Sequence, residues 1–496
     1  MSNLLILSST LRIPRTSEKC RGIPCGQGAW IYWSGRRDSD PRPSAWEADT
    51  LPLSYARNTD FINHTCLKVK EGSILNYFNK DYMLIFTMIS LSSYELKTKI
   101  LADRYNSIIF EVGKNRDLYL VGGYIRDIFR GIHSSDRDYI VSGDIRTFVK
   151  EIRKVIGGTI VKFKKGDMIR IALKDGLTFD FSKPIGTLKE DLSKRDFTIN
   201  ALAWSPEKGV IDLYNGLEDI KKKKIRALSE INLIYDPLRM FRAYRFAAEL
   251  NGSIEKETRN LIKTLNNNIK KVTSERITLE LFNLLNPVHS SKYLKMALSD
   301  GLLTSILLIP HKTLESNIKA ISLLEKATVR KLPAKLKVQL NKIFSQNLTY
   351  KGLLCLGLLL SNDLDAQKSI ADIKVSTIIR KRMELVHKGI EVLSRKRIKL
   401  KDRLFNTFMR SKEATIDILI IKGKLDLIKD YERFKRIWNK GLLCSEDIIS
   451  ISDIKTGPIL GAIIVELKKA QFEGRVKSRK AAIKFIRNLN YSRMTR

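Results

Sequence analysis

Cysteine and histidine are scarce in the sequence, and neither is arranged as a metal site. The five cysteines are scattered through 496 residues without a CxxC pair, and the five histidines form no cluster at zinc-ligand spacing. This spacing argues against a disulfide framework and predicts no zinc site. Isolated cysteines are typical of a reducing compartment, so we expect a cytoplasmic protein whose cysteines pack as small apolar residues.

Long apolar runs are absent, and acidic residues are few. The longest apolar runs, Met83–Ile89 and Gly352–Leu360, are far shorter than the ~20 residues of a membrane-spanning helix, so no membrane partner is predicted. Lys and Arg number 90 and Asp and Glu only 53, a net charge of +37. This excess favours a polyanion partner, most commonly nucleic acid, over a basic surface without a partner. Charge alone does not separate RNA from DNA or acidic lipid.

Residues 1–82 show no sustained hydrophobic period, yet they hold three of the five tryptophans. The segment Gly35–Pro52 resembles the conceptual translation of a tRNA gene, and the beginning of the chain lacks the pattern of a signal peptide. We therefore interpret residues 1–82 as a non-native or disordered extension and expect the protein to start at Met83 or Met88. The excess of basic residues remains when this segment is left out.

From Leu91 onward the pattern becomes regular and predicts a small α+β unit followed by helices. Residues beyond Asp191 are dominated by Leu, Ile and Lys at helical spacing, with little Gly or Pro and few strand signals. The elements expected before that point are helices over Leu91–Val112 and Tyr124–Phe129 and strands over Leu118–Val121, Asp138–Val141 and Thr178–Phe181.

The chemistry-bearing residues begin at the end of the first strand. Gly122 and Gly123 lack side chains, so their backbone N–H groups can approach an anion at the start of a helix, and Arg126 lies one turn further on. Asp136 and Asp138, two residues apart, share one face of the next strand. A Gly-Gly turn alone is a weak signal, and an isolated Asp-x-Asp is usually a solvated turn. Together they predict a phosphate cradle beside two carboxylates, the arrangement that two Mg²⁺ ions need.

The stretch Leu120–Asp138 resembles the head of the DNA polymerase beta-like superfamily, in particular the class II tRNA nucleotidyltransferases and bacterial poly(A) polymerases. The resemblance is specific over Leu118–Glu280 and weaker toward the C-terminus. Three further segments match the family's motifs in order, and a fourth resembles its tail: Asp191–Ala203, with Lys194 where the family has arginine, then Asp236–Phe246, Glu275–Glu280 and Gly457–Gly461.

The resemblance implies an architecture and an activity. It implies a polymerase-beta-like nucleotidyltransferase head (83–205), an all-helical neck with a nucleotide-selecting motif (206–285) and a helical, RNA-binding body and tail (286–496). The implied reaction is template-independent addition of C and/or A to the tRNA 3′ end from CTP and ATP, with Mg²⁺. Arg195 and Asp196 would bind the triphosphate and ribose hydroxyl of the incoming nucleotide.

Asp236, Arg239, Arg242 and Arg245 recur every three residues, so we expect them along one helical face. Such a face is equally well explained by solvation or salt bridges. The resemblance implies instead that Asp236 and Arg239 read the base, because adenine and cytosine both present an amino donor beside a ring-nitrogen acceptor. Arg242 and Arg245 would then meet phosphate or ribose.

Deprotonation of the attacking 3′-hydroxyl usually requires a third carboxylate. Asp180 is our candidate, on the same strand face as Thr178, with Asp175 and Asp167 as alternatives.

Several activities remain open from the sequence. A poly(A) polymerase of the same family and a catalytically inactive RNA-binding relative are the main alternatives, although intact Asp136, Asp138, Arg195 and Arg239 argue against the inactive relative. No histidine is followed by aspartate, so the His-Asp phosphohydrolase domain that some relatives append is not expected. The short segment Phe181–Lys189 resembles enzymes restricted to CC addition.

Overall fold

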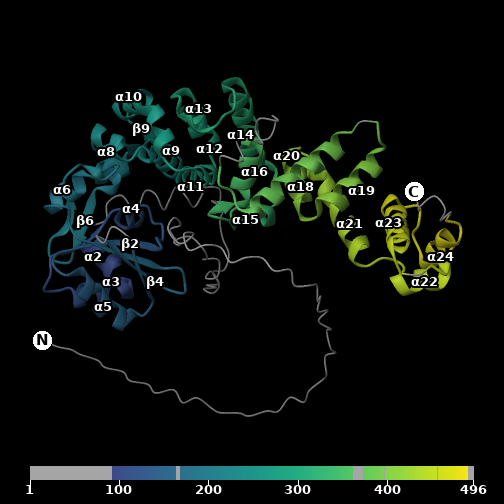
Figure 1. The fold of residues 1–496 in the computed structure, drawn as a ribbon, viewed down its shortest axis with the longest axis horizontal. Coiled ribbons are helices and arrows are strands. Elements are labelled where there is room, and N and C mark those ends of the chain that lie inside the picture. Colours follow the sequence, from purple (N-terminus) through teal and green to yellow (C-terminus); the bar gives the residue numbers. More distant parts are fainter. Residues whose placement is uncertain (1–91, 164–167, 361–372, 396, 455, 490–496) are drawn as a thin grey trace, which may run out of the picture. The chain divides into compact units, whose positions relative to one another are not determined.

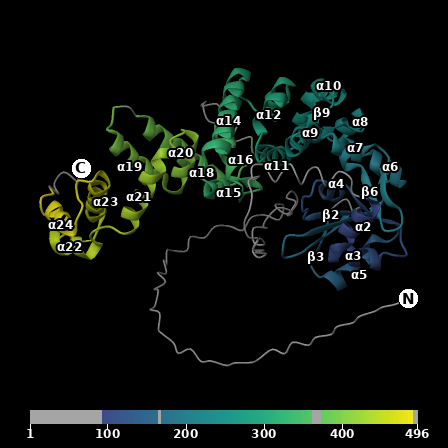
Figure 2. The same ribbon diagram turned by 180° about the vertical axis from the view of Figure 1, so that it is seen from behind.

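The computed structural model describes residues 92–163, 168–360, 373–395, 397–454 and 456–489 (Figures 1 and 2). The N-terminal segment 1–82, the expected starts at Met83 and Met88, and Asp167 lie outside the described residues.

The strands of the described chain are β1 (Leu118–Val121), β2 (Asp136–Val141), β3 (Thr159–Lys162), β4 (Met168–Ala172), β5 (Thr178–Ser182), β6 (Leu202–Ser205), β7 (Gly209–Asp212), β8 (Lys224–Ile225), β9 (Ser253–Ile254), β10 (Ile343–Ser345) and β11 (Leu348–Thr349).

The α-helices are α2 (Ser93–Ala102), α3 (Arg104–Val112), α4 (Gly123–Phe129), α5 (Ile145–Ile156), α6 (Leu188–Ser193), α7 (Gly216–Lys221), α8 (Glu230–Tyr235), α9 (Leu238–Leu250), α10 (Lys256–Leu265), α11 (Ser274–Leu285), α12 (Ser290–Ser299), α13 (Leu302–Ile306), α14 (His311–Lys331), α15 (Ala334–Leu340), α16 (Tyr350–Leu360), α18 (Thr377–Ser394), α19 (Leu400–Ser411), α20 (Thr415–Ile421), α21 (Ile428–Asn439), α22 (Ser445–Ser452), α23 (Pro458–Glu473) and α24 (Arg479–Arg487). Short 3₁₀ turns, η1 (Thr198–Asn200), η2 (Asn266–Lys271), η3 (Lys412–Ala414) and η4 (Leu425–Leu427), connect some of them.

The head is built on a seven-stranded mixed sheet in the order β3-β4-β5-β2-β1-β6-β7, and its two faces differ. On one face the apolar side chains of β1, β2 and β5, including Tyr139 and Phe181, pack against Phe148 of α5 in the main core. The other face carries the alternate residues, among them Val121, Asp138 and Ile140. Alternation along β2 therefore separates the apolar core from the carboxylates.

The sheet and the helical remainder confirm the predicted α+β class. The predicted boundary at 205, however, falls within a hairpin, because β7 pairs antiparallel with β6 (Ser205 with Gly209) and extends the sheet to Asp212. The region predicted to be all-helical also contains two small sheets, β8 with β9 and β10 with β11. Strands of two to four residues are too short to produce a clear alternation in the sequence.

The single helix predicted over Leu91–Val112 is two helices. The break lies at Asp103, whose backbone is extended and whose carboxylate accepts hydrogen bonds from the N–H groups of Tyr105 and Asn106. Asp103 thereby caps the start of α3. Aspartate is favoured at this N-cap position and is less favourable in the interior of a helix.

Beyond the head, the helices bury Leu and Ile in three apolar clusters. The main core continues from the sheet through α9, α11, α12 and α16. A second cluster is rich in aromatic rings, among them Phe405, Phe408 and Phe434, and a third lies among α22, α23 and α24. None of the helices in the described ranges has both the length and the apolar character that a membrane span requires.

Candidate active site

Carboxylates meet on the second face of the sheet because of strand register. Strand β2 pairs parallel with β5, so Asp136 lies beside Thr178 and Asp138 beside Asp180. Strand β1 pairs antiparallel with β2 and places Val121, the residue before the Gly-Gly turn, beside Asp138. Directly paired residues point to the same side of a sheet. Three strands thus place Asp136, Asp138, Asp180 and the turn on one face.

The predicted third carboxylate, Asp180, is held by an arginine that the sequence did not single out. Arg170 of β4 donates from Nε and Nη2 to the two oxygens of Asp180, both at 2.6 Å. This bidentate pair occupies both oxygens of Asp180. Of the alternatives, Asp175 is exposed and accepts a hydrogen bond from the N–H of Leu177. The role of Asp180 toward the attacking hydroxyl stays a prediction.

The charge on the two β2 aspartates is poorly compensated by the protein itself. Burial and the neighbouring Asp180 raise the pKa of the Asp138 carboxyl to about 6, although Arg195 opposes this shift. Burial also raises the pKa of Asp136, against the hydrogen bond from the Thr178 hydroxyl. Crowded, partly desolvated carboxylates of this kind are stabilised in their charged form by a cation. Hard oxygen donors on one strand face therefore fit a divalent ion such as Mg²⁺.

No group of three or more His, Cys, Asp or Glu side chains within the described ranges is arranged to hold a metal by itself. This is compatible with magnesium, which is commonly bound by one or two carboxylates together with water and substrate phosphates.

Gly122 has a different function from the one predicted. Its N–H donates to the carbonyl of Leu202 at 2.9 Å, so this group is not available to a phosphate. Its φ is +78°, and a Cβ there would lie 2.6 Å from Nη1 of Arg195 and 3.5 Å from a carboxylate oxygen of Asp138. The glycine therefore allows Arg195 to lie beside Asp138. Gly123 opens α4, where a Cβ would contact the Arg126 guanidinium at 3.4 Å.

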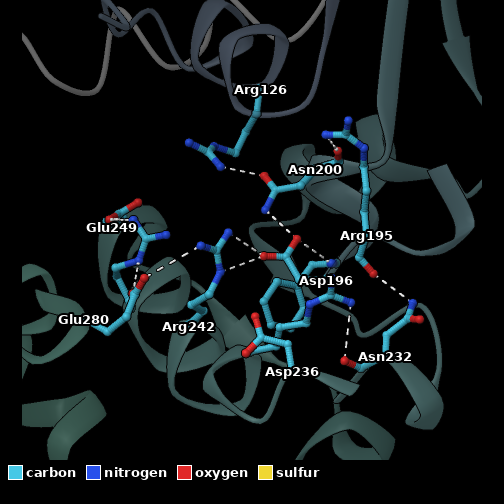
Figure 3. Close-up of polar contacts among 12 residues, drawn as sticks. Arg126, Arg195, Asp196, Asn200, Asn232, Asp236, Arg242, Glu249 and Glu280 are labelled. Carbon is cyan, nitrogen blue, oxygen red and sulfur yellow. Dashed lines mark hydrogen bonds and ion pairs between the residues drawn. The ribbon is translucent and has the colours of Figure 1, made fainter. Parts of the chain in front are cut away.

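Arg126 is a buried part of a polar network rather than an exposed cation (Figure 3). Its Nε and Nη2 donate to the carboxylate of Asp127 at 3.0 Å, and its Nη1 donates to Oδ1 of Asn200 at 2.6 Å. Asn200 in turn donates to Asp196 at 2.9 Å. In this structure the Arg126 side chain joins α4 to the segment that carries Asp196. Its contact with a triphosphate stays a prediction.

Asp196 is buried and accepts from four groups. Arg242 donates to Oδ2 from Nε at 2.8 Å and lies within 2.6 Å of it through Nη2, while Asn200 and the N–H of Phe197 donate to Oδ1. Burial would raise the pKa of Asp196, but these partners outweigh it and lower the pKa to about 2. A fully bonded carboxylate has little capacity left for a ribose hydroxyl, so its predicted role as a direct ligand is not supported by this geometry.

Arg242 and Arg245 are both paired with carboxylates, and their expected contact with phosphate or ribose stays a prediction. Nε of Arg245 lies 2.7 Å from Glu280 of α11 and its Nη1 donates to Glu249 at 3.0 Å, while Nη1 of Arg242 lies 3.7 Å from Glu280. The structure therefore contains the salt bridges of the alternative explanation, and those of Arg242 can be followed in Figure 3. They tie α9 to the head and to α11.

The ring of Phe246 lies at the centre of these arginines. The guanidinium carbons of Arg126, Arg242 and Arg245 lie 4.9, 5.1 and 4.0 Å from its centroid. Such contacts are favourable when the cation is partly desolvated. The ring therefore helps three like charges to pack closely.

The predicted base-reading pair, Asp236 and Arg239, is not on one helix. Asp236 ends α8 in an extended conformation, and α9 begins only at Leu238. The cause is Pro237, because a residue before proline is disfavoured in the helical conformation.

The side chains of this pair keep unused hydrogen-bonding capacity. Nη1 of Arg239 donates to the carbonyls of Lys194 (2.8 Å) and Asn232 (3.3 Å). Within the described part of the chain, its Nε and Nη2 have no hydrogen-bond partner. Asp236 accepts from Arg276 through Oδ2 at 2.9 Å, and its Oδ1 has no partner among the described residues. The unused donors of Arg239 and the unused Oδ1 of Asp236 are therefore only three residues apart in the sequence.

Arg170, Asn232 and Arg276 are site residues that the sequence did not reveal. Asn232 donates to the carbonyls of Ser193 (2.7 Å) and Arg195 (2.8 Å) and so attaches α8 to the Arg195 segment. Arg170 alternates with apolar residues in β4, which is a weak signal of a strand face bearing charge. The sequence offers no comparable signal for Asn232.

Two family models match this chain. The model described as the poly A polymerase head domain matches residues 174–226, and the one described as a probable RNA and SrmB-binding site of polymerase A matches residues 253–313.

Two of the curated relatives illustrate alignment over nearly their whole length. A CC-adding tRNA nucleotidyltransferase of Synechocystis sp. is 28% identical over 398 residues, which cover 75% of this chain and 94% of the relative. A CCA-adding enzyme of Lactobacillus gasseri is 27% identical over 413 residues, covering 75% and 94%. The solved Thermotoga maritima CCA-adding enzyme complexed with tRNA shares the fold, with a TM-score of 0.62 at 20% identity, over 80% of this chain and 98% of that one.

Proposed function

We propose that this chain adds C and A residues to the 3′ end of tRNA, because it belongs to the family of class II tRNA nucleotidyltransferases and bacterial poly(A) polymerases. The nucleotides would come from CTP and ATP, with release of pyrophosphate and without a nucleic-acid template. The observation that carries this proposal is the placement of Asp136, Asp138 and Arg195 beside the Gly-Gly turn. The proposed location is the cytoplasm, because the proposed substrates, tRNA, CTP and ATP, occur there.

Asp136 and Asp138 are the proposed ligands of Mg²⁺, which when bound would make the 3′-hydroxyl more acidic and stabilise charge on the leaving pyrophosphate. Arg195 lies beside Asp138 and is the proposed partner of the triphosphate, because its Nη2 is 3.7 Å from Asp191 and its cation is only loosely paired. The bond that forms joins the RNA 3′-oxygen to the α-phosphorus, and the bond that breaks releases the β- and γ-phosphates.

Asp236 and Arg239 are proposed to select the base. The free Oδ1 of Asp236 can accept from the amino group of cytosine or adenine, and the free nitrogens of Arg239 can donate to the adjacent ring nitrogen. Guanine and uracil present the opposite polarity on that edge and leave both protein groups unpaired.

The Arg239→Ala variant should lose selectivity roughly ten- to hundredfold, because a good bidentate base contact contributes on the order of 1–3 kcal/mol. Incorporation of all four nucleotides is measured alongside the melting temperature. UTP and GTP use should rise relative to CTP and ATP. If Arg239 served only to hydrogen-bond the carbonyls of Lys194 and Asn232, the variant would have a lower melting temperature and an unchanged nucleotide preference.

The helical body and tail, residues 286–496, are proposed to hold the tRNA through phosphates. The chain's net charge of +37 and the family match at 253–313, which begins in the neck, support this. We expect tRNA affinity to fall at least about tenfold between 50 and 200 mM salt, because neutralising phosphates releases counterions. Fluorescence anisotropy with labelled tRNA would measure this, and a flat dependence would contradict a phosphate grip.

Purified protein supplied with tRNAs that lack A, CA or CCA, with CTP, ATP or both, tests the proposed reaction directly by sequencing of the products. Restriction to CC addition is a second candidate, favoured by the short connection of residues 183–187 between β5 and α6. Long A tails would identify a poly(A) polymerase, and no extension of any substrate would contradict the proposal.

A further inference from the structure

Helix α8 presents an exposed apolar face beside the proposed base site. Ile231, Ile234 and Tyr235 are 74%, 48% and 84% exposed. Positions i, i+3 and i+4 lie on one side of a helix, so these three side chains are neighbours. Single exposed apolar residues are common, but three adjacent ones next to a proposed site indicate a surface that is covered during function.

The opposite side of α8 is fixed to the head. Asn232 and Leu233 are buried, and Asn232 donates to the carbonyls of Ser193 and Arg195. Arg239 reinforces this attachment through the carbonyl of Asn232 at 3.3 Å. The exposed face is therefore carried on a short helix anchored to the segment that bears Arg195.

Tyr235 is the member of this face closest to the base-reading groups in the chain. It directly precedes Asp236, and α8 ends at Tyr235. Burial lowers the pKa of Arg239, while Asp196, Asp236 and Tyr235 oppose that shift, so Tyr235 lies within electrostatic range of the Arg239 guanidinium. In their proposed role Asp236 and Arg239 contact the edge of a base, which leaves its flat face for another partner.

We infer that the Tyr235 ring is a stacking surface for a nucleobase, a role that rests on the proposed function. Aromatic side chains stack on any base because every base has a π-face. The base could belong to the incoming nucleotide or to the terminal nucleotide of the RNA, and the same ring would serve either. Ile231 and Ile234 extend the exposed apolar surface on the same side of α8.

The test compares Tyr235→Ala and Tyr235→Phe with the unaltered full chain. Equilibrium binding of CTP, ATP and tRNA is measured together with KM and kcat for addition. Tyr235→Ala should raise KM and the dissociation constant for the stacked partner roughly 5- to 150-fold, the range for loss of one base–aromatic stack. Tyr235→Phe should restore binding, since the ring is kept. The melting temperature should not change, because the side chain is exposed.

Tyr94→Ala is the matched control, because Tyr94 is 79% exposed on α2 and has no proposed role in the site. Weakened nucleotide binding in Tyr235→Ala would assign the ring to the incoming base, and weakened tRNA binding would assign it to the RNA end. Unchanged binding of both would overturn the inference. So would unchanged binding with an altered oligomeric state, which would assign the face to a protein contact.

An inactive unaltered chain would be a failure of the proposed function. The binding measurements would still report on Tyr235 in that case, since they do not require turnover.

Discussion

Replacing Asp138 with asparagine should lower nucleotide addition at least about 10³-fold, or about 4 kcal/mol of transition-state stabilisation, with tRNA binding nearly unchanged. The carboxylate lies near Asp136, Asp180 and Arg195 on one face of the sheet, and its charge is the property that a divalent ion requires. The amide keeps the shape of the side chain and removes the charge. Asp136→Asn should have the same effect. Single-turnover rates at saturating tRNA would measure the loss.

Asp175→Asn is the control for this experiment, because Asp175 is an exposed carboxylate in the turn before β5. It should retain full activity. A large loss in Asp175→Asn would instead make it the third carboxylate in place of Asp180. Near-normal turnover in Asp138→Asn or Asp136→Asn would contradict metal binding by β2.

The Asp196→Asn variant should lower the free energy of unfolding at neutral pH by about 3 kcal/mol, because it removes the closer of the two carboxylates that pair with the half-buried Arg242 guanidinium and leaves only Glu280, 3.7 Å away. The effect should depend on pH with a definite sign. The folded pKa of Asp196 is about 2, below that of an unfolded aspartate, so its contribution is full above about pH 4 and is lost as the pH falls toward 2. Urea unfolding from pH 7 to 3 should show the difference between the two proteins falling by roughly half.

Asp447 provides the matched control. Its pKa is also lowered to about 2, by the hydrogen bond from Arg479, but this pair is on the surface, where water and salt screen it. Asp447→Asn should therefore change stability much less than Asp196→Asn. Equal losses in the two variants would show that burial of the Asp196–Arg242 pair adds nothing.

The parts of the site that depend on short sequence spacing were predictable. Asp136 and Asp138 share a face because side chains alternate along a strand, and the structure places them so. The α+β class follows from the hydrophobic pattern, and the resemblance to the nucleotidyltransferase family follows from the order of the motifs. The glycine at position 122 is needed for the close approach of Arg195, whereas the sequence predicts the approach of a phosphate there.

The parts that depend on distant contacts were not predictable. The Arg126–Asn200 bond spans 74 residues and the Arg242–Asp196 bond 46, and nothing local in the sequence encodes such partners. The three-residue spacing of Asp236 and the arginines was read as one helical face, and Pro237 divides it. Arginines at this spacing can bind phosphate or carboxylate, and the sequence does not reveal that Asp196 and Glu280, which are distant along the chain, lie next to them.

The alternation of β2 also protects the site against errors in folding. Arg137, between the two aspartates, is buried on the opposite face with its guanidinium over the rings of Tyr124 (5.0 Å) and Phe179 (5.2 Å). A slip of one residue would move both carboxylates into the apolar core and Arg137 out of it. Such a sheet would bury uncompensated charge and would not be stable. Correct pairing of β2 therefore also places Asp136 and Asp138 on the face of the proposed site, because the mispaired strand that would misplace them is unstable.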